Sequence, residues 1–236
     1  MQKLRPRPAL HKEIVQSLTE KIISGELPPD SLLPPERELI RQLGVSRTVV
    51  RESIKFLESK GLVRIERGRG TIVQEPHPDT ITDLLRLLLR RREARIEQLL
   101  ELRAILEVGI AGLAAERRTG EHLEAMQHEL EVMRHKPGEP EGYVYADVRF
   151  HAAIAKAAQN PLLLPLLQPL EELLLESRLV TFSGPRVVKI RTSQHEEIYN
   201  RIAARDSAGA RAAMRRHLAD TMRDLERQRR SPEPQL

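Results

Sequence analysis

Four potential metal ligands fall on the apolar stripes of three segments with helical spacing: Asp147, His151, His195 and His217. Asp147 and His151 are four residues apart, so they project from one helix face. The apolar residues that share these faces are Tyr143, Phe150, Ile154, Val188, Ile198, Ile202, Ala210, Ala213 and Met214. Burying a carboxylate among such neighbours is costly unless it is paired or binds a metal. Three imidazoles and one carboxylate suit zinc, nickel or manganese.

The metal prediction depends on these four residues occurring as a set. A lone inward-facing histidine is more often a satisfied core or surface residue than a ligand. The remaining histidines lack convergent partners and are expected to have no metal role: His11, His77, His122, His128 and His135.

A second group of candidates is basic and lies within residues 31–73. Two short helices are expected at 35–43 and 47–60, joined by a tight turn in which Gly44 ends the first and Ser46 caps the second. Leu39, Ile40 and Leu43 are expected to face inward on the first helix. The second helix separates a buried stripe from an exposed one, and the exposed stripe holds Arg47, Thr48, Arg51 and Lys55.

These residue types suit DNA. Arginine pairs with guanine in the commonest specific contact of a major groove, and Ser or Thr near a helix N-terminus can hold phosphate. A hairpin follows with the tip Arg67-Gly68-Arg69-Gly70, which can track a backbone or enter a minor groove. The bland alternative is a small helical domain with a solvated basic face, but the clustering of these arginines on the second helix favours DNA binding.

The composition is that of a globular protein of two domains. The chain has 236 residues, a net charge of +5 and no cysteine. Residues 1–75 hold 14 Lys and Arg against 10 Asp and Glu, so most of the excess positive charge is N-terminal. The N-terminus has no apolar segment typical of a signal peptide, and no stretch is long and apolar enough to span a bilayer. We therefore expect a cytoplasmic protein.

Two resemblances add to this reading. The run L-P-P-E-R-E-L…L-G-V-S-R-T-V-V-R-E-S…G-L-V…G-R-G-T is similar to the winged helix-turn-helix of GntR-type bacterial transcription regulators. The order Asp147-x-x-Phe150-His151, His195-x-x-Ile198 and Met214-x-x-His217-Leu218 resembles the FCD effector domain of the FadR-type branch of that family. The first covers about residues 10–75 and the second about 80–225.

The resemblance implies roles for particular residues. Contacts with DNA are implied for Arg37, Arg47, Arg51 and the wing residues Arg67, Gly68 and Arg69, to which the residue chemistry adds Ser46 and Thr48. The four metal candidates are implied to bind a divalent ion whose coordination a small carboxylate effector completes.

Arg103 is the candidate effector-binding residue. It shares a stripe with Leu99, Leu106 and Ile110, so it points inward, where a guanidinium needs an anion. That anion is either Glu107, one turn on, or the carboxylate of an effector. Arg149 and Arg178 are weaker candidates and alternatively surface charges.

The predicted fold is mainly α: a winged helix-turn-helix over residues 1–75, a short linker over 76–79, an all-helical antiparallel bundle of six or seven helices over 80–228, and a frayed tail over 229–236. In the first part a helix is also expected at 10–24 and strands near 62–65 and 71–73. In the bundle, helices are expected near 79–91, 95–117, 120–134, 141–158, 161–182, 186–204 and 207–228.

The predicted function is a homodimeric transcription regulator, a repressor by preference, that binds a palindromic operator and responds to a small organic acid at the metal site. One alternative is a metal-dependent hydrolase or lyase fused to a DNA-binding head. The sequence shows no further inward acid or histidine to serve as its base, which counts against it. Another alternative is a metal-free sensor of an acyl-CoA or similar effector. The sequence identifies neither the effector nor the metal.

Overall fold

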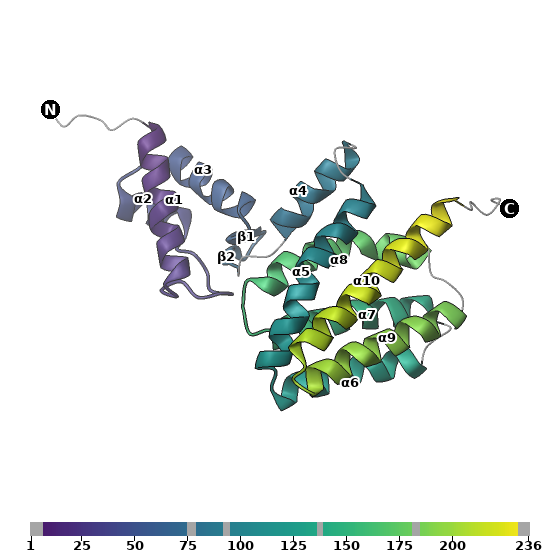
Figure 1. Ribbon diagram of the computed structural model, residues 1–236. Helices are drawn as coiled ribbons and strands as arrows, with labels where there is room; N and C mark the ends of the chain where they lie inside the picture. Colours follow the sequence, from purple (N-terminus) through teal and green to yellow (C-terminus); the bar gives the residue numbers. More distant parts are fainter. Residues whose placement is uncertain (1–6, 75–78, 92–94, 136–138, 181–184, 231–236) are drawn as a thin grey trace. The chain divides into compact units, whose positions relative to one another are not determined.

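The computed structural model describes residues 7–74, 79–91, 95–135, 139–180 and 185–230 (Figure 1). The chain divides into two compact units, Met1–Thr80 and Ile81–Leu236. Most of the expected linker (76–78) and of the expected frayed tail (231–236) lies outside the described residues. The fold class predicted from the sequence, a winged helix-turn-helix followed by a helical bundle, is confirmed.

The N-terminal unit holds three helices followed by a two-stranded antiparallel hairpin. The elements are α1 (Arg7–Ile23), α2 (Glu36–Leu43), α3 (Arg47–Ser59), β1 (Val63–Glu66) and β2 (Gly70–Val73). In the hairpin, Val63 pairs with Val73 and Glu66 with Gly70. An isolated bridge from Leu32 to Ile72 attaches the segment before α2 to the outer side of β2.

Local signals set the turn between α2 and α3. Gly44 has φ +64°, a left-handed conformation that glycine adopts without the steric cost of a Cβ, and its N–H donates to Ile40 O at 3.0 Å. The Ser46 hydroxyl accepts from the N–H of Val49 at 3.4 Å and so caps α3. The turn fixes the direction in which α3 leaves α2.

The core of this unit is built from one face of each helix and the inner side of the hairpin. On α3 the side chains of Val50, Ile54 and Leu57 are buried, as predicted. On α2 Leu39 is buried, but the expectation for Leu43 is wrong, since it is 38% exposed. Leu43 is the last residue of a two-turn helix, directly before the left-handed Gly44, and the buried face of α2 has already turned away from it.

The C-terminal unit is a bundle of seven helices within the described residues (Figure 1). They are α4 (Asp79–Arg90), α5 (Ile96–Arg117), α6 (Gly120–His135), α7 (Pro140–Ala157), α8 (Leu163–Val180), α9 (Pro185–Ala203) and α10 (Ser207–Arg230). Helix α10 packs along α5 and α9, while α7 packs between α6, α8 and α5. The inner faces of α5, α7, α9 and α10 therefore meet in one core.

That core is apolar around a polar centre. Small residues such as Ala111, Ala114 and Ala146 let the helices approach closely, and Phe150, Met126 and Met133 fill the larger spaces. A smaller apolar cluster of Leu99, Leu100, Leu170 and Leu174 lies where α5 meets α8, and Leu85 and Leu89 of α4 pack on it. The predicted ligand positions lie inside the larger core.

Candidate metal centre and nucleic-acid interface

The structure brings the four predicted ligands together. Asp147 and His151 come from α7, His195 from α9 and His217 from α10, and one donor atom of each lies within 4.8 Å of the others. The ring centroids of His195 and His217 are 4.4 Å apart, and those of His151 and His217 are 5.3 Å apart. This spacing gives three nitrogens and one oxygen around a common point.

The donor atoms are buried, and some of them have no hydrogen-bond partner, as expected for atoms that bind a metal. All three imidazoles are at most 3% exposed and Asp147 is 9% exposed. The Nε2 atoms of His151 and His195 are buried without a hydrogen-bond partner. The Nε2 atom of His195 lies 3.0 Å from Asp147 Oδ1 without forming a hydrogen bond to it. Buried polar nitrogens of this kind are rare, and a shared divalent cation would satisfy both.

The electrostatics of the cluster also fit a cation. Burial lowers the pKa of His195, and burial together with the neighbouring His195 and His151 holds the pKa of His217 well below its usual value. Burial alone would raise the pKa of Asp147, but the Arg178 guanidinium outweighs it and holds that pKa well below the usual range. Two neutral imidazoles and an ionised carboxylate are the forms that bind metal.

Further polar groups orient two of the rings. His151 Nδ1 makes a hydrogen bond to Glu107 of α5, and His217 Nδ1 lies 3.3 Å from Gln194 Oε1 of α9. Burial alone would lower the pKa of His151, but the Glu107 carboxylate raises it overall. With the Nδ1 proton donated to these oxygens, the Nε2 atom of each ring is left for a cation. This is how proteins commonly fix a metal-binding histidine.

Asp147 is the first member of a chain of buried ion pairs. Arg178 Nη1 donates to Asp147 Oδ2 at 2.8 Å and lies 2.7 Å from Glu171 Oε2. Both Arg178 and Glu171 belong to α8, seven residues or two turns apart, and the side chain of Arg178 is only 13% exposed. A single guanidinium thus links a predicted ligand to a second buried carboxylate.

The chain continues back to His151. Arg103 Nη2 lies 2.8 Å from Glu171 Oε1, an ionic contact without hydrogen-bond geometry, and Arg103 Nε donates to Glu107 Oε1 at 2.6 Å. Burial alone would raise the pKa of Glu107, but Arg103 and His151 hold it at about 2. Glu107 also binds His151, and His151 Nε2 lies 3.9 Å from Asp147 Oδ1, so the chain of contacts returns to Asp147 and forms a closed ring. We call the six residues the charge ring: Asp147, Arg178, Glu171, Arg103, Glu107 and His151.

Of the three predicted effector-binding residues, Arg103 and Arg178 belong to the charge ring and Arg149 does not. Arg103 is 1% exposed and paired with Glu107, which is the alternative that the sequence left open, and also with Glu171. Arg178 is a member of the ring, so reading it as a surface charge was wrong. Arg149 lies elsewhere: its Nε donates to both oxygens of Glu129 at 2.9 Å, and its side chain is 52% exposed.

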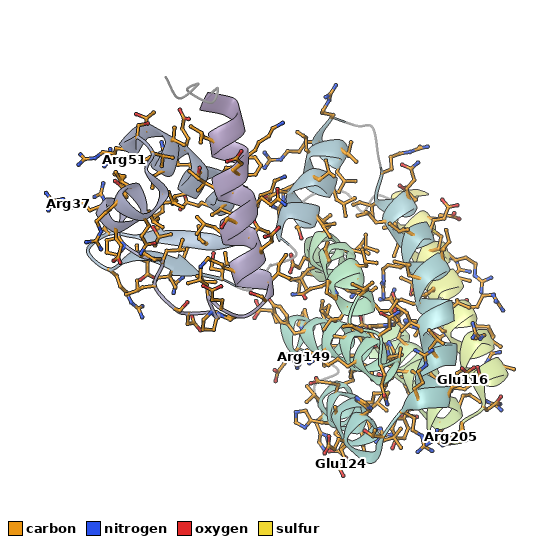
Figure 2. All side chains as sticks on the ribbon, turned by 90° about the vertical axis from the view of Figure 1, so that its left-hand side faces the viewer. Arg37, Arg51, Glu116, Glu124, Arg149 and Arg205 are labelled. Atoms are coloured by element: carbon orange, nitrogen blue, oxygen red, sulfur yellow. The ribbon has the colours of Figure 1, made fainter. Side chains whose placement is uncertain are left out.

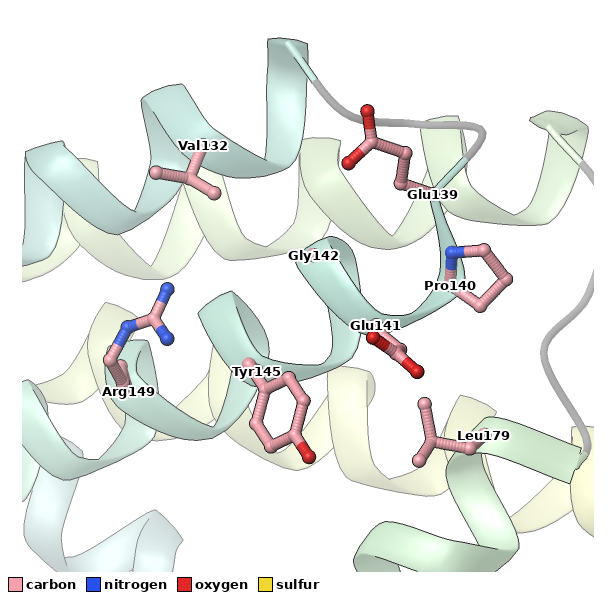
Figure 3. Close-up of a pocket in the computed structure, with 8 residues that line it drawn as sticks. All are labelled: Val132, Glu139, Pro140, Glu141, Gly142, Tyr145, Arg149 and Leu179. Atoms are coloured by element: carbon pink, nitrogen blue, oxygen red, sulfur yellow. The ribbon is translucent and has the colours of Figure 1, made fainter.

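Arg149 lines an open groove of about 830 Å³ bordered by α6, α7 and the end of α8 (Figure 3). The groove is lined by Val132, Glu139, Pro140, Glu141, Gly142, Tyr145, Arg149 and Leu179. None of the four predicted ligands is among them. The groove and the ligand cluster are therefore distinct features of the C-terminal unit.

The sequence reading missed three residues of this centre. Glu171 lies on the stripe of Leu167 and Leu174, the same signal that identified Asp147, so its inward direction could have been predicted. Glu107 was weighed only as a partner of Arg103, and Gln194 was not considered. The expectation that no further inward acid is present to serve as a base is wrong, since Glu107 and Glu171 are both buried. Together with His151 they form a second possible ligand set, but both already pair with arginines.

The predicted DNA-binding residues lie on exposed surface of the N-terminal unit. Arg47, Thr48 and Arg51 project from the outer face of α3, and Arg37 is exposed on α2. Figure 2 shows Arg37 and Arg51 extending from the same side of this unit. The stripe of Arg47, Thr48, Arg51 and Lys55 on α3 is thus exposed, as the helical spacing predicted.

The hairpin presents the remaining candidates. Arg67, Gly68 and Arg69 form the exposed turn between β1 and β2, where Gly68 has φ +80°. Arg69 Nη1 lies 3.3 Å from Glu66 Oε2, and Arg64 also binds Glu66. A glycine at this φ allows the tight turn without strain. Among the described residues, no helix combines the length and apolar character needed to cross a bilayer.

A winged helix-turn-helix with a basic reading helix, followed by a helical unit with a buried ligand set, defines the class of two-domain DNA-binding regulators. Residues 10–73 match the family described as "Bacterial regulatory proteins, gntR family", and residues 98–220 match the FCD domain. The chain is 39% identical over 204 residues to the HTH-type transcriptional regulator LutR of Bacillus subtilis (strain 168), covering 84% of this chain and 93% of the relative.

Two further comparisons agree. The putative L-lactate dehydrogenase operon regulatory protein of Escherichia coli (strain K12) is 33% identical over 218 residues, covering 89% of this chain and 84% of the relative. The solved structure of Streptococcus agalactiae GntR has a TM-score of 0.76 and 25% identity, covering 90% of this chain and 99% of that one. The chain belongs to the GntR family of bacterial transcription regulators and carries an FCD domain. It is a DNA-binding regulator and not an enzyme.

Proposed function

We propose that this regulator binds a divalent metal ion through Asp147, His151, His195 and His217 and that a small carboxylate effector completes the coordination. The observation that carries the proposal is the convergence of these donors with two buried, partnerless Nε2 atoms. When bound, the ion would supply a Lewis-acidic anchor for an oxygen ligand. Zinc, nickel and manganese all suit this donor set.

Elemental analysis of purified protein tests the metal proposal. We expect about one equivalent of metal per chain, lost in Asp147→Ala and His217→Ala. His128→Ala is the matched control, because His128 is an exposed histidine on α6. Full retention of metal in both ligand variants would contradict the proposal.

The charges around the centre favour an anionic effector. Asp147, Glu107 and Glu171 carry three negative charges, and Arg103 and Arg178 carry two positive ones. With the histidines neutral, as metal ligands must be, a divalent cation would turn this balance of −1 into +1, which one carboxylate would neutralise. We propose that Arg103, and beside it Arg178, supply the positive surroundings of that carboxylate. Arg149 is the less favoured candidate, since it lies on the separate groove.

A thermal-shift series on metal-loaded protein tests the effector class. The probes are acetate, L-lactate and citrate, of which L-lactate is chosen because one relative is named after an L-lactate dehydrogenase operon. We expect an increase in melting temperature with at least one carboxylate, absent from protein in which His217→Ala has removed the metal. Equal shifts with and without metal would argue against coordination by the effector.

A metal-free sensor remains a second candidate for one specific reason. The charge ring already satisfies Asp147 through Arg178 without any cation. In that case an acyl-CoA or similar effector would bind to a purely organic network. Purified protein without stoichiometric metal, whose stability does not respond to added zinc, nickel or manganese, would favour this candidate.

On the DNA side, we propose that Arg37, Ser46, Arg47, Thr48 and Arg51 contact the major groove and its phosphates, and that Arg67, Gly68 and Arg69 reach the adjacent groove. All eight residues are exposed, and Arg37 and Arg51 extend from the same side of the N-terminal unit (Figure 2), which supports this. We also propose that the protein acts as a homodimer on a palindromic operator, since two-fold protein symmetry matches two half-sites. A protein that acts on chromosomal DNA would work in the cytoplasm.

Arg47→Ala tests the placement of the reading helix. We expect a loss of about 1–3 kcal/mol in discrimination between operator and scrambled DNA, with unchanged circular dichroism. Lys12→Ala on α1 is the control for a loss of positive charge alone. Unchanged discrimination in Arg47→Ala would contradict the proposal that α3 reads the DNA bases.

We propose repression that the effector relieves. The coupling must then be reciprocal: an effector that weakens operator binding must bind the operator complex less tightly by the same factor. Titrations of the carboxylate that passes the thermal-shift test, with and without operator, measure both sides of this cycle. Equal affinities in the two titrations would rule out the switch.

A further inference from the structure

Glu36 and Arg51 form an ion pair between the two helices of the helix-turn-helix. Arg51 Nε lies 3.0 Å from both carboxylate oxygens of Glu36, and the two residues are 15 positions apart in the chain. Arg51 belongs to the exposed face of α3, whereas Glu36 is the first residue of α2. We propose that Glu36 is a positioning residue that sets the specificity of base readout by Arg51. This inference rests on the proposed role of Arg51 in DNA binding.

The geometry of the pair leaves the reading edge of Arg51 available. In the described part of the chain, the hydrogen bonds of the Arg51 side chain are made by Nε. Its Nη1 and Nη2 atoms carry the N–H groups that can pair with guanine O6 and N7. A carboxylate held at Nε therefore fixes the plane of the guanidinium without occupying the edge that meets the base.

Holding the guanidinium in place matters because the side chain is long and exposed. The Arg51 side chain is 59% exposed and carries the rotamer freedom typical of arginine. Without a partner, Arg51 would lose that freedom only on binding DNA, and it could reach phosphates as readily as bases. A fixed orientation reduces the entropy lost in the correct complex and disfavours the alternatives.

Glu36 also places a negative charge beside residues that approach phosphates. That charge weakens binding to any duplex, so a residue selected only for affinity would not be acidic here. Stabilising the N-terminus of α2 does not by itself explain it, because Glu38 lies in the same first turn. Within the residues that the structure describes, the carboxylate of Glu38 pairs with its own helix, at 3.0 Å from Gln42 Nε2 and 3.7 Å from Arg41 Nη2. Glu38 is thus a matched control for charge and helix position.

The test uses the full-length protein and two duplexes: one selected by the wild-type protein from a randomised library, and one of the same length and composition with scrambled sequence. The measured quantity is the ratio of the two affinities at fixed salt. We expect Glu36→Gln to lower this ratio about 5-fold, the upper range for an exposed ion pair, while binding the scrambled duplex no more weakly than wild type. Glu38→Gln should leave the ratio unchanged.

Two more variants separate positioning from charge. Glu36→Asp keeps the charge but shortens the reach, so it should lower the ratio without strengthening binding to the scrambled duplex. In an Arg51→Ala background, Glu36→Gln should have no further effect on the ratio, because the group that it positions is gone. Circular dichroism of each variant checks that the fold is retained.

The outcomes divide cleanly. Equal strengthening on both duplexes in Glu36→Gln and Glu38→Gln would reduce Glu36 to a surface charge and overturn the inference. A lowered ratio in Arg51→Ala together with an unchanged ratio in Glu36→Gln would also overturn it, while leaving the proposed function standing. If the wild-type protein selects no sequence above the scrambled duplex, the proposed function itself fails.

Discussion

Removing the guanidinium of Arg103 should cost the C-terminal unit far more than removing an exposed one. Arg103 pairs with Glu107 at 2.6 Å and with Glu171 at 2.8 Å, and all three side chains are at most 3% exposed. In Arg103→Leu both carboxylates stay buried and lose their shared cation. Breaking one buried pair costs about 3–5 kcal/mol, so we expect a loss of at least that size in the free energy of unfolding.

Urea unfolding followed by circular dichroism at 222 nm measures this loss. In thermal unfolding it corresponds to roughly 6–20 °C for a protein of this size. The matched control is Arg134→Leu, which breaks a pair with Glu196 in which the two side chains are 49% and 35% exposed. That change should cost about 0–1 kcal/mol.

A rescue variant checks the cause. Adding Glu107→Gln and Glu171→Gln to Arg103→Leu removes the uncompensated charges, so part of the lost stability should return. Similar losses in Arg103→Leu and Arg134→Leu, or no recovery in the rescue variant, would refute the reasoning that the ring is held by charge pairing. Arg103→Ala is for the same reason a poor probe of effector binding alone.

Three other predictions follow from local contacts. Gln194→Ala removes the oxygen beside His217 Nδ1 and should weaken metal binding about 10-fold by calorimetry, with Ser193→Ala as control. Hydrogen bonds from the backbone N–H of Gly209 and from Arg201 lower the pKa of Asp206. The stability that Asp206 contributes is therefore present above its unfolded pKa and is lost as the pH falls through the lower folded pKa. Unfolding curves of Asp206→Asn and of the wild type should converge in acid. Gly44→Ala forces a Cβ at φ +64° and should destabilise the N-terminal unit by roughly 1 kcal/mol in chemical unfolding, whereas Gly120→Ala should not.

Helical periodicity was enough to find the four candidate ligands. Each sits on an apolar stripe of its own helix, and the inner faces of a bundle meet in one core. Spacing within a helix therefore predicted which side chains point inward. The same reasoning located the basic stripe of α3: Val50, Ile54 and Leu57 are buried, whereas Arg47, Arg51 and Lys55 are exposed.

Contacts between helices could not be predicted in this way. Arg178 meets Asp147 only because α8 crosses α7 at one particular height, and the register of two packed helices depends on the crossing angle and on the side chains at the contact. Periodicity carries no such information. The pairing of Glu36 with Arg51 was missed for the same reason, since it joins two helices across a turn.

The charge ring has a consequence for any acid that enters the centre. Each guanidinium is already shared between two of the chain's own carboxylates, and Glu171 is the one that both arginines contact. An incoming anion would have to displace Glu171 in order to bind Arg103 or Arg178. Glu171 is held beside the same nitrogens by the fold and so competes at a high effective concentration. Only a molecule with a second binding group would gain enough binding free energy to displace Glu171. The centre would therefore exclude simple anions through competition with Glu171 and not through the shape of its cavity.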